Sequence, residues 1–241
     1  ITGNIDNPGG RCQAVNAQWT YPPGPKTKPA PRKLSFIDDI ASTTALPEFG
    51  AGHSVLRRIK KSGERPGLYM WYHHNPAYAN GSTQETVEIL KDESLLPFTV
   101  AVTPFYDETA ALADLILPDA TYLERYDIEA AVSPGQVPEY ALRQPFVDPQ
   151  GEARDFKDVC CELAKRLDIK LGFKSAEKII DKACKLTKVV KKKARGFRGM
   201  KKIGVWHDKK ALPAYYAYRE RIENKTLAAD DVLLDEATGV Y

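Results

Sequence analysis

Three groups of polar residues could bind a ligand, and each group follows a short apolar run of the chain. Asn75 and Pro76 come after the first run, Thr103 and Asp107 close the second, and Arg125 comes after the third. Amide and carboxylate oxygens accept hydrogen bonds, hydroxyls donate and accept them, and arginine binds anionic groups. If the chain binds a ligand, the loops that carry these residues are expected to hold it.

The three apolar runs predict the strands of one parallel sheet. They span residues 67–72, 97–103 and 115–117, and helical patterns lie between them at residues 83–91 and after Asp107. Strand–helix–strand units with short links form parallel sheets, which bind ligands beyond the carboxyl ends of their strands. The expected fold class is α/β, with a Rossmann-like βαβαβ sheet flanked by helices and with the polar groups at one edge.

Around this sheet we expect a loop-rich N-terminal part and a helical C-terminal part. Five prolines between residues 21 and 31 make residues 1–34 a linker from a preceding domain that is missing here. Residues 35–170 are expected to form the α/β domain, and residues 171–241 a helical extension that leads to a missing C-terminal domain. Further helices are expected over residues 35–40, 54–62, 155–167, 175–190 and 213–222.

Composition and charge exclude few classes of protein. The 241 residues are 43% hydrophobic and carry a net charge of +3, which is ordinary for a globular protein, and no run approaches the ~18 apolar residues of a membrane span. The four cysteines lack the Cys-x2-Cys spacing of metal sites, and neither they nor the histidines supply a metal-binding set, so we expect no metal ligands.

One basic tract leaves a second interpretation open. Residues 185–202 contain nine basic residues and no acid, which taken alone suggests nucleic-acid binding. The tract has a single aromatic residue, Phe197, and lies between helical segments. A solvated helix face or a docking surface is therefore the favoured interpretation.

Several segments, in order, resemble the dimethyl-sulfoxide-reductase family of molybdenum enzymes. Residues 104–118 with Glu124-Arg125 are similar to its "teTa-xx-AD-xx-LP … yxEr" signature. Residues 2–10 resemble its "TGNidrpGG" turn, His74-Asn75-Pro76 its "xNP" loop, and residues 149–154 its "pxGEak" segment. The aromatic composition of residues 69–80 and 121–127 favours the branch that reduces polysulfide, thiosulfate, tetrathionate or arsenate.

The resemblance implies that this region holds one guanine dinucleotide of a molybdenum bis(molybdopterin guanine dinucleotide) cofactor. The cofactor-binding positions that it implies are Asn75, Pro76, Val102, Thr103, Asp107, Arg125 and Asp155. Thr103 departs from the family, because a hydroxyl binds ribose more weakly than a carboxylate does, and Phe156 stands where an acid is usual. Purely structural alternatives are an Asx turn at Asn75, an exposed ion pair between Glu124 and Arg125, and a turn-stabilising role for Asp114.

The whole protein would be the catalytic subunit of an oxidoreductase that acts on a small sulfur or arsenic oxyanion. The family implies a 4Fe-4S cluster in the missing N-terminal part, an iron–sulfur electron-transfer subunit, a membrane anchor, and an extracytoplasmic or membrane-associated location. We expect no nucleic-acid partner and no membrane insertion by this chain, and no activity from residues 1–241 alone. The rival hypotheses are a stand-alone nucleotide-binding α/β module, although no Gly-x-Gly-x-x-Gly is present, and a nucleic-acid-binding protein.

Overall fold

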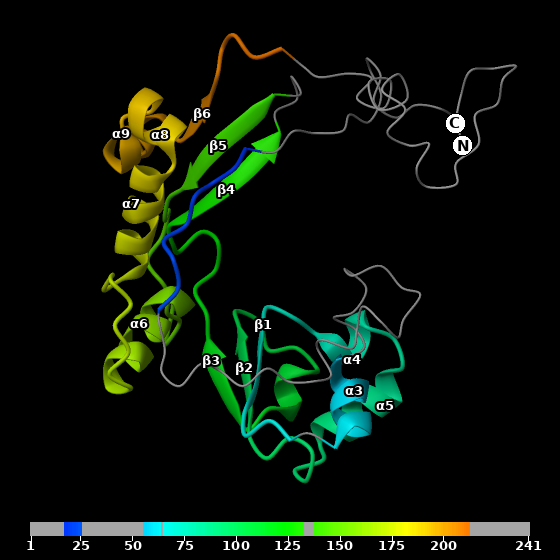
Figure 1. Ribbon diagram of the computed structural model, residues 1–241. Coiled ribbons are helices and arrows are strands. Elements are labelled where there is room, and N and C mark those ends of the chain that lie inside the picture. Colours follow the sequence, from blue (N-terminus) through cyan, green and yellow to red (C-terminus); the bar gives the residue numbers. More distant parts are fainter. Residues whose placement is uncertain (1–16, 26–54, 64, 133–136, 213–241) are drawn as a thin grey trace, which may run out of the picture. The chain divides into compact units, whose positions relative to one another are not determined.

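The computed structural model describes residues 17–25, 55–63, 65–132 and 137–212 (Figure 1). The chain divides into two compact units, each with its own sheet and its own hydrophobic core. The parallel-sheet unit comprises Pro23–Arg125 and Pro145–Lys178. The antiparallel-sheet unit comprises Ile1–Pro22, Tyr126–Gln144 and Ile179–Tyr241.

The parallel-sheet unit contains the sheet that the sequence predicts. Its strands are β1 (Tyr69–Tyr72), β2 (Thr99–Thr103) and β3 (Leu115–Pro118), in the order β1-β2-β3 and parallel throughout. All five residues of the central strand β2 are buried, which explains why its sequence is almost continuously apolar or β-branched. The expected α/β class and the positions of all three strands are confirmed.

Helices lie on one side of this sheet (Figure 1). They are α3 (Val55–Ser62), α4 (Pro76–Ala79) and α5 (Thr83–Leu90). Leu56 and Ile59 of α3 and Ile89 of α5 pack with Trp71 and Ala101 of the sheet in one buried core. Burial of this face is the main force that holds the helices against the sheet.

The short link between β2 and β3 forms a 3-10 turn, η2 (Ala110–Leu112), where the sequence predicts a longer helix. Asp114 stabilises the end of this link, since its carboxylate accepts hydrogen bonds from the backbone N–H (2.7 Å) and the hydroxyl (2.8 Å) of Thr99. The expectation that Asp114 is a structural residue agrees with these contacts. Because β3 begins at Leu115, too little chain remains for a full α-helix.

Helix α6 (Phe156–Arg166) completes the parallel-sheet unit and begins at Asp155, as the sequence predicts. Its apolar stripe is largely exposed: Ala164 is the buried residue of the helix, whereas Leu163 and Leu167 are 42% and 68% exposed. The helix expected over residues 155–167 is thus confirmed, and much of its apolar surface is exposed.

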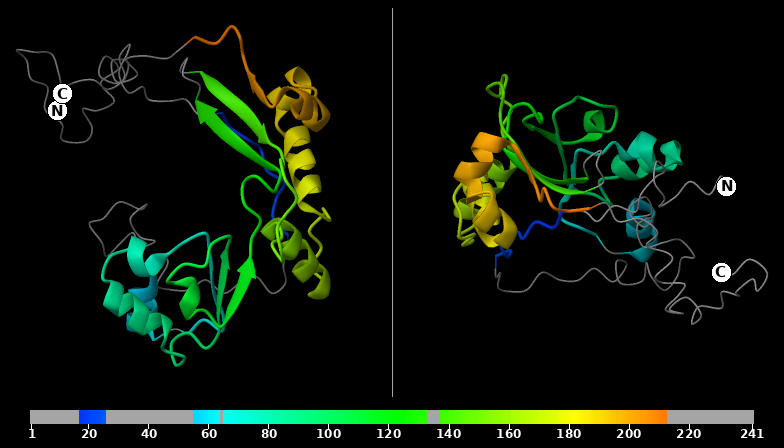
Figure 2. Two further views of the ribbon diagram at one scale, coloured as in Figure 1. Left: turned by 180° about the vertical axis from the view of Figure 1, so that it is seen from behind. Right: turned by 90° about the horizontal axis from the view of Figure 1, so that it is seen from above.

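The antiparallel-sheet unit contains elements that the sequence does not reveal. Strands β4 (Asp127–Val132), β5 (Pro138–Arg143) and β6 (Val205–His207) form an antiparallel sheet in that order. Helices α7 (Ala176–Leu186), α8 (Lys188–Lys193) and α9 (Gly196–Ile203) lie along one face of it (Figure 2). Trp19 joins the sheet through a hydrogen bond from its indole N–H to the Glu129 carbonyl (2.9 Å).

This grouping differs from the expected segments 35–170 and 171–241, because the β4–β5 hairpin packs with the C-terminal helices. The predicted helix 175–190 is interrupted at Thr187, which is the N-cap of α8. Pairing between β5 and β6 spans more than sixty residues of chain, so no local pattern signals it. The expected helices at residues 35–40 and 213–222 lie outside the described residues.

The basic tract 185–202 forms parts of these helices. Its apolar residues Val190, Ala194 and Met200 are fully or almost fully buried in the core of the unit, and Lys191, Lys192 and Lys193 are exposed. Charges on the outer side of packed helices are the arrangement of a solvated face.

Candidate functional site

The carboxyl ends of the three parallel strands form one edge at which three loops begin. The backbone N–H of His73 donates to the Val102 carbonyl (2.9 Å), and that of Asp119 donates to the Thr103 carbonyl (3.2 Å). The sheet ladder thus continues one residue past β1 and β3. We call this edge, with the loops that follow the strands and the start of α6, the carboxyl-edge site.

Asp119 lies at the centre of the carboxyl-edge site and its side chain is fully buried. Its Oδ2 accepts a hydrogen bond from the Tyr72 hydroxyl (3.0 Å), lies 2.7 Å from His73 Nε2, and pairs with Arg125 Nη1. Its Oδ1 accepts from the backbone N–H of Phe156 (2.8 Å). One carboxylate therefore joins β1, the loop after β3 and the start of α6.

Asp119 is not among the site residues predicted from the sequence. The signal that could have identified it is its position, since it is an acid directly after Pro118 at the end of a predicted strand of a parallel sheet. Tyr72 is a second unpredicted member, and its ring stacks on Phe156 at 5.4 Å and on His73 at 4.2 Å between centroids.

Arg125 is 8% exposed and belongs to this network. Its Nη1 also donates to the Tyr72 hydroxyl at 2.8 Å. Burial is the largest single effect and lowers the pKa of the guanidinium, but the charges of Asp119 and Tyr72 and the hydrogen bonds to both together outweigh it and raise the pKa above the ordinary value. Arg125 is thus a charged group whose field is largely cancelled by Asp119.

The alternative of an exposed ion pair between Glu124 and Arg125 is wrong. Both residues are buried, and Glu124 accepts hydrogen bonds from the backbone N–H groups of Thr121 (2.7 Å) and Gln150 (3.0 Å). The backbone hydrogen bond from Thr121 is the main reason that the pKa of Glu124 is lowered. Glu124 joins the loop after β3 to the segment before α6.

Asn75 connects the loop after β1 to the loop after β2. Its side-chain amide donates to Glu108 (2.9 Å) and its oxygen accepts from the hydroxyl of the buried Thr109, which in turn accepts from the Ala77 N–H (3.1 Å). No side-chain cap bond is made at the start of α4, so the Asx turn is not formed. The buried Pro76 is the first residue of that helix.

Val102 contributes through its backbone, and Thr103 contributes through its backbone and its hydroxyl. The Val102 side chain lies inside the sheet at 1% exposure, and only its carbonyl reaches the edge. The Thr103 hydroxyl exchanges hydrogen bonds with the backbone of Phe105 (3.1 and 3.2 Å). This hydroxyl shapes its own loop.

The two remaining predicted positions stabilise turns. Asp107 accepts a hydrogen bond from the Ala110 N–H (2.7 Å), which closes the turn before η2. Asp155 caps α6 by accepting from the Lys157 N–H (2.9 Å), and burial raises the pKa of its carboxyl. Asp119 also accepts a hydrogen bond from the Phe156 N–H, so carboxylates already bind N–H groups in the first turn of α6. These N–H groups are therefore not available to a phosphate.

The loops expose flat rings and an acid toward solvent. Tyr78 follows β1, Phe105 and Tyr106 follow β2, and Tyr122 follows β3, and all four are more than 60% exposed. The exposed carboxyl of Glu108 has a lowered pKa, chiefly through a hydrogen bond from its own backbone N–H. Aromatic faces beside an ionised carboxylate can stack on a purine and accept from its N–H groups.

Two further observations concern metals and membranes. No group of three histidine, cysteine or acidic side chains within the described residues is arranged to hold a metal ion. None of the helices that can be described is both long and apolar enough to span a membrane.

Comparison with known proteins identifies the family. The sequence model of the molybdopterin oxidoreductase family matches residues 1–166. The chain therefore belongs to the molybdopterin oxidoreductases, which are molybdenum- and pterin-dependent enzymes, and the sequence resemblance is confirmed.

The relatives include enzymes of sulfur metabolism. The chain is 33% identical over 184 residues to the molybdopterin-containing subunit of thiosulfate reductase from Salmonella typhimurium, covering 70% of this chain and 24% of that protein. It is 27% identical over 211 residues to a sulfite dehydrogenase subunit from Allochromatium vinosum, covering 70% of this chain and 22% of that protein. The chain thus spans about a quarter of these relatives. Acetylene hydratase from Pelobacter acetylenicus superposes with a TM-score of 0.46 at 20% identity, over 76% of this chain and 21% of that one.

Proposed function

We propose that the carboxyl-edge site holds one guanine dinucleotide of a bis(molybdopterin guanine dinucleotide) cofactor in the catalytic subunit of an oxyanion oxidoreductase. The observation that carries the proposal is the gathering of exposed aromatic rings and the Glu108 carboxylate where three parallel strands end. Guanine requires an acceptor for its N1–H and amino group, and a carboxylate supplies two.

The residues named from the sequence keep a role in this proposal, but mostly as supports. Asn75 and Asp107 hold the loop from which Glu108 projects, and Thr103 shapes the turn that carries Phe105. Arg125 with Asp119 fixes the relative position of β1 and the start of α6. Direct contacts would come from Glu108, the exposed rings and backbone N–H groups.

The cofactor would supply the two-electron chemistry, and this chain would supply binding and orientation. We propose a sulfur oxyanion such as thiosulfate as the substrate, because two relatives act on sulfur compounds. An iron–sulfur cluster in another part of the protein, a membrane anchor and a separate iron–sulfur subunit belong to the same proposal. The exposed lysines of residues 191–193 on packed helices favour a solvated surface over nucleic-acid binding.

The test is cofactor analysis of the full-length protein. We expect molybdenum or tungsten together with two guanine nucleotides per chain after acid hydrolysis, and reduction of thiosulfate by viologen dyes. Glu108→Gln and Tyr106→Ala should lower guanine retention several-fold, because each removes a direct contact.

Glu93→Gln and Phe98→Ala are the matched controls, since both change an exposed acidic or aromatic residue that precedes β2, at the opposite end of the sheet from the carboxyl-edge site. Full retention in the edge variants would refute the site, and absence of guanine nucleotide would refute the cofactor.

A further inference from the structure

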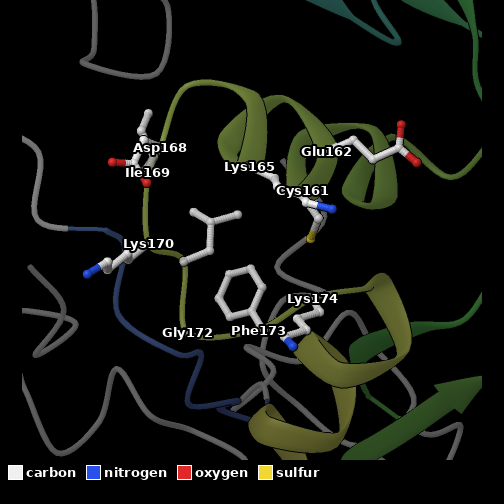
Figure 3. Close-up of a pocket in the computed structure, with 10 residues that line it drawn as sticks. Cys161, Glu162, Lys165, Asp168, Ile169, Lys170, Gly172, Phe173 and Lys174 are labelled. Atoms are coloured by element: carbon white, nitrogen blue, oxygen red, sulfur yellow. The ribbon is translucent and has the colours of Figure 1, made fainter.

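A hollow lies at the C-terminal end of α6, whereas the carboxyl-edge site includes the start of this helix, and the two share no residue (Figure 3). Its volume is about 810 Å³, within the range of small-molecule sites. One wall is the last half of α6, including Cys161 and Lys165, and the other is the loop that follows, residues 168–174. Figure 3 shows the ring of Phe173 between the loop and the helix.

Both ends of the loop are fastened to α6. At its start, Asp168 adopts a left-handed conformation (φ 53°) and the Ile169 N–H donates to the Ala164 carbonyl at 2.7 Å. At its end, the Ala176 N–H donates to the Asp158 carboxylate, also at 2.7 Å. The loop is therefore anchored to the helix at both ends, and the hollow lies between the helix and the part of the loop between these two points.

The lining combines an apolar floor with a basic rim. Ile169, Leu171 and Phe173 are only partly buried, and they give the hollow its apolar surface. Three lysines surround it: Lys165, Lys170 and Lys174.

The acids of the lining do not cancel these charges. Glu162 is held by the guanidinium of Arg154 through contacts of 2.7 and 3.3 Å. Neither Lys170 nor Lys174 forms an ion pair with any residue that the structure describes. Glu162 also interacts with the charge of Lys165. Counting Arg154, four basic groups face the two acids Glu162 and Asp168, so the rim carries an excess of positive charge.

We propose that this hollow binds a small amphiphilic anion, with an aromatic or aliphatic body against Phe173 and Leu171 and a carboxylate, sulfonate or phosphate group at the lysines. Burial of the body provides the affinity, and the lysines select a negatively charged head group over a neutral one. The site is separate from the proposed cofactor function and stands if that function fails.

The test uses the full-length protein and the fluorescent probe 8-anilinonaphthalene-1-sulfonate, with the uncharged N-phenyl-1-naphthylamine as its matched partner. The double variant Lys170→Gln/Lys174→Gln should weaken binding of the sulfonate probe about five-fold at low salt. It should change binding of the neutral probe less than about two-fold. Phe173→Ala should weaken both probes. Lys60→Gln/Lys91→Gln and Phe146→Ala, which change exposed residues elsewhere, should weaken neither.

Cysteine labelling locates the probe. Cys161 lines the hollow, whereas the neighbouring Cys160 does not, so bound sulfonate should slow alkylation of Cys161 several-fold and leave Cys160 unchanged. No saturable binding, equal losses in the control variants, or equal protection of both cysteines would each overturn the proposal.

Discussion

The buried carboxylate of Asp119 and the buried guanidinium of Arg125 form an ion pair at the carboxyl edge of the parallel sheet, and the Tyr72 hydroxyl bridges the two charges. Because each charge is compensated inside the protein, Arg125 is not an independent cation for phosphate. The pair instead sets the geometry of the loops on which the exposed side chains stand.

Asp119→Asn should destabilise this edge by on the order of 3–5 kcal/mol, because it leaves the Arg125 charge buried without a counter-charge. Amide hydrogen exchange of β1 and of the first turn of α6 is the measurement, and exchange in both should become faster. Asp148→Asn, at an exposed position, is the control. Unchanged protection in the Asp119 variant would show that the pair does not hold these elements together.

Tyr72→Phe should cost less, about 1–2 kcal/mol, because it removes the bridging hydroxyl and keeps the ring stacked on Phe156. Its effect should be non-additive with Asp119→Asn, since both changes remove the same hydrogen bond. Additive losses of protection in the double variant would mean that the hydroxyl acts independently of Asp119.

Asn75→Ala and Thr109→Val should show the same kind of coupling, because the two side chains share one hydrogen bond between the loops after β1 and β2. Amide hydrogen exchange of α4 and η2, measured in the two single variants and the double variant, should give a coupling free energy of about 1 kcal/mol. A coupling near zero would indicate that these loops are held together by backbone contacts alone.

Glu124 should make the loop after β3 sensitive to acid. Its folded pKa lies below its unfolded value, so its stabilising effect is complete above the unfolded pKa, about 4.3, and is lost as the pH falls through the lower folded pKa. Protection of residues 121–124, corrected for intrinsic exchange, should fall in the wild type below about pH 4. In Glu124→Gln, residues 121–124 should be less protected from exchange at neutral pH, and their protection should no longer depend on pH in this range. Glu93→Gln should resemble the wild type.

Cys184 should resist alkylation in the folded protein. Its side chain is fully buried in the core of the antiparallel-sheet unit, and burial raises the pKa of its thiol to about 11. At pH 8 only about one thiol in a thousand would be ionised. Peptide mapping after iodoacetamide treatment should find the exposed Cys160 labelled well before Cys184. Equal labelling would mean that the unit opens readily.

Local sequence patterns determined the parallel sheet and its neighbouring helices. The apolar runs at β1, β2 and β3 are short and sharply bounded, and helical patterns were predicted at the positions of α5 and α6, so these elements follow from residues near one another in the chain. The motif order likewise sufficed for the family, which the comparison confirms. Polar residues after the strands also indicated which edge would carry a site.

The role of each side chain at that edge was decided only by tertiary structure. Asp119 meets Tyr72 and Phe156 across 47 and 37 residues of chain, and such contacts leave no trace in local spacing. The pairing of β5 with β6 was missed for the same reason, since these strands pair across the C-terminal helices. The β4–β5 hairpin is local, and it was not predicted although neighbouring segments form it. A hydrogen bond depends on distance in space, whereas a sequence pattern records only distance along the chain. The sequence therefore identified the edge and the residue types, and the fold determined that Arg125 pairs with Asp119 and that Glu108 faces solvent.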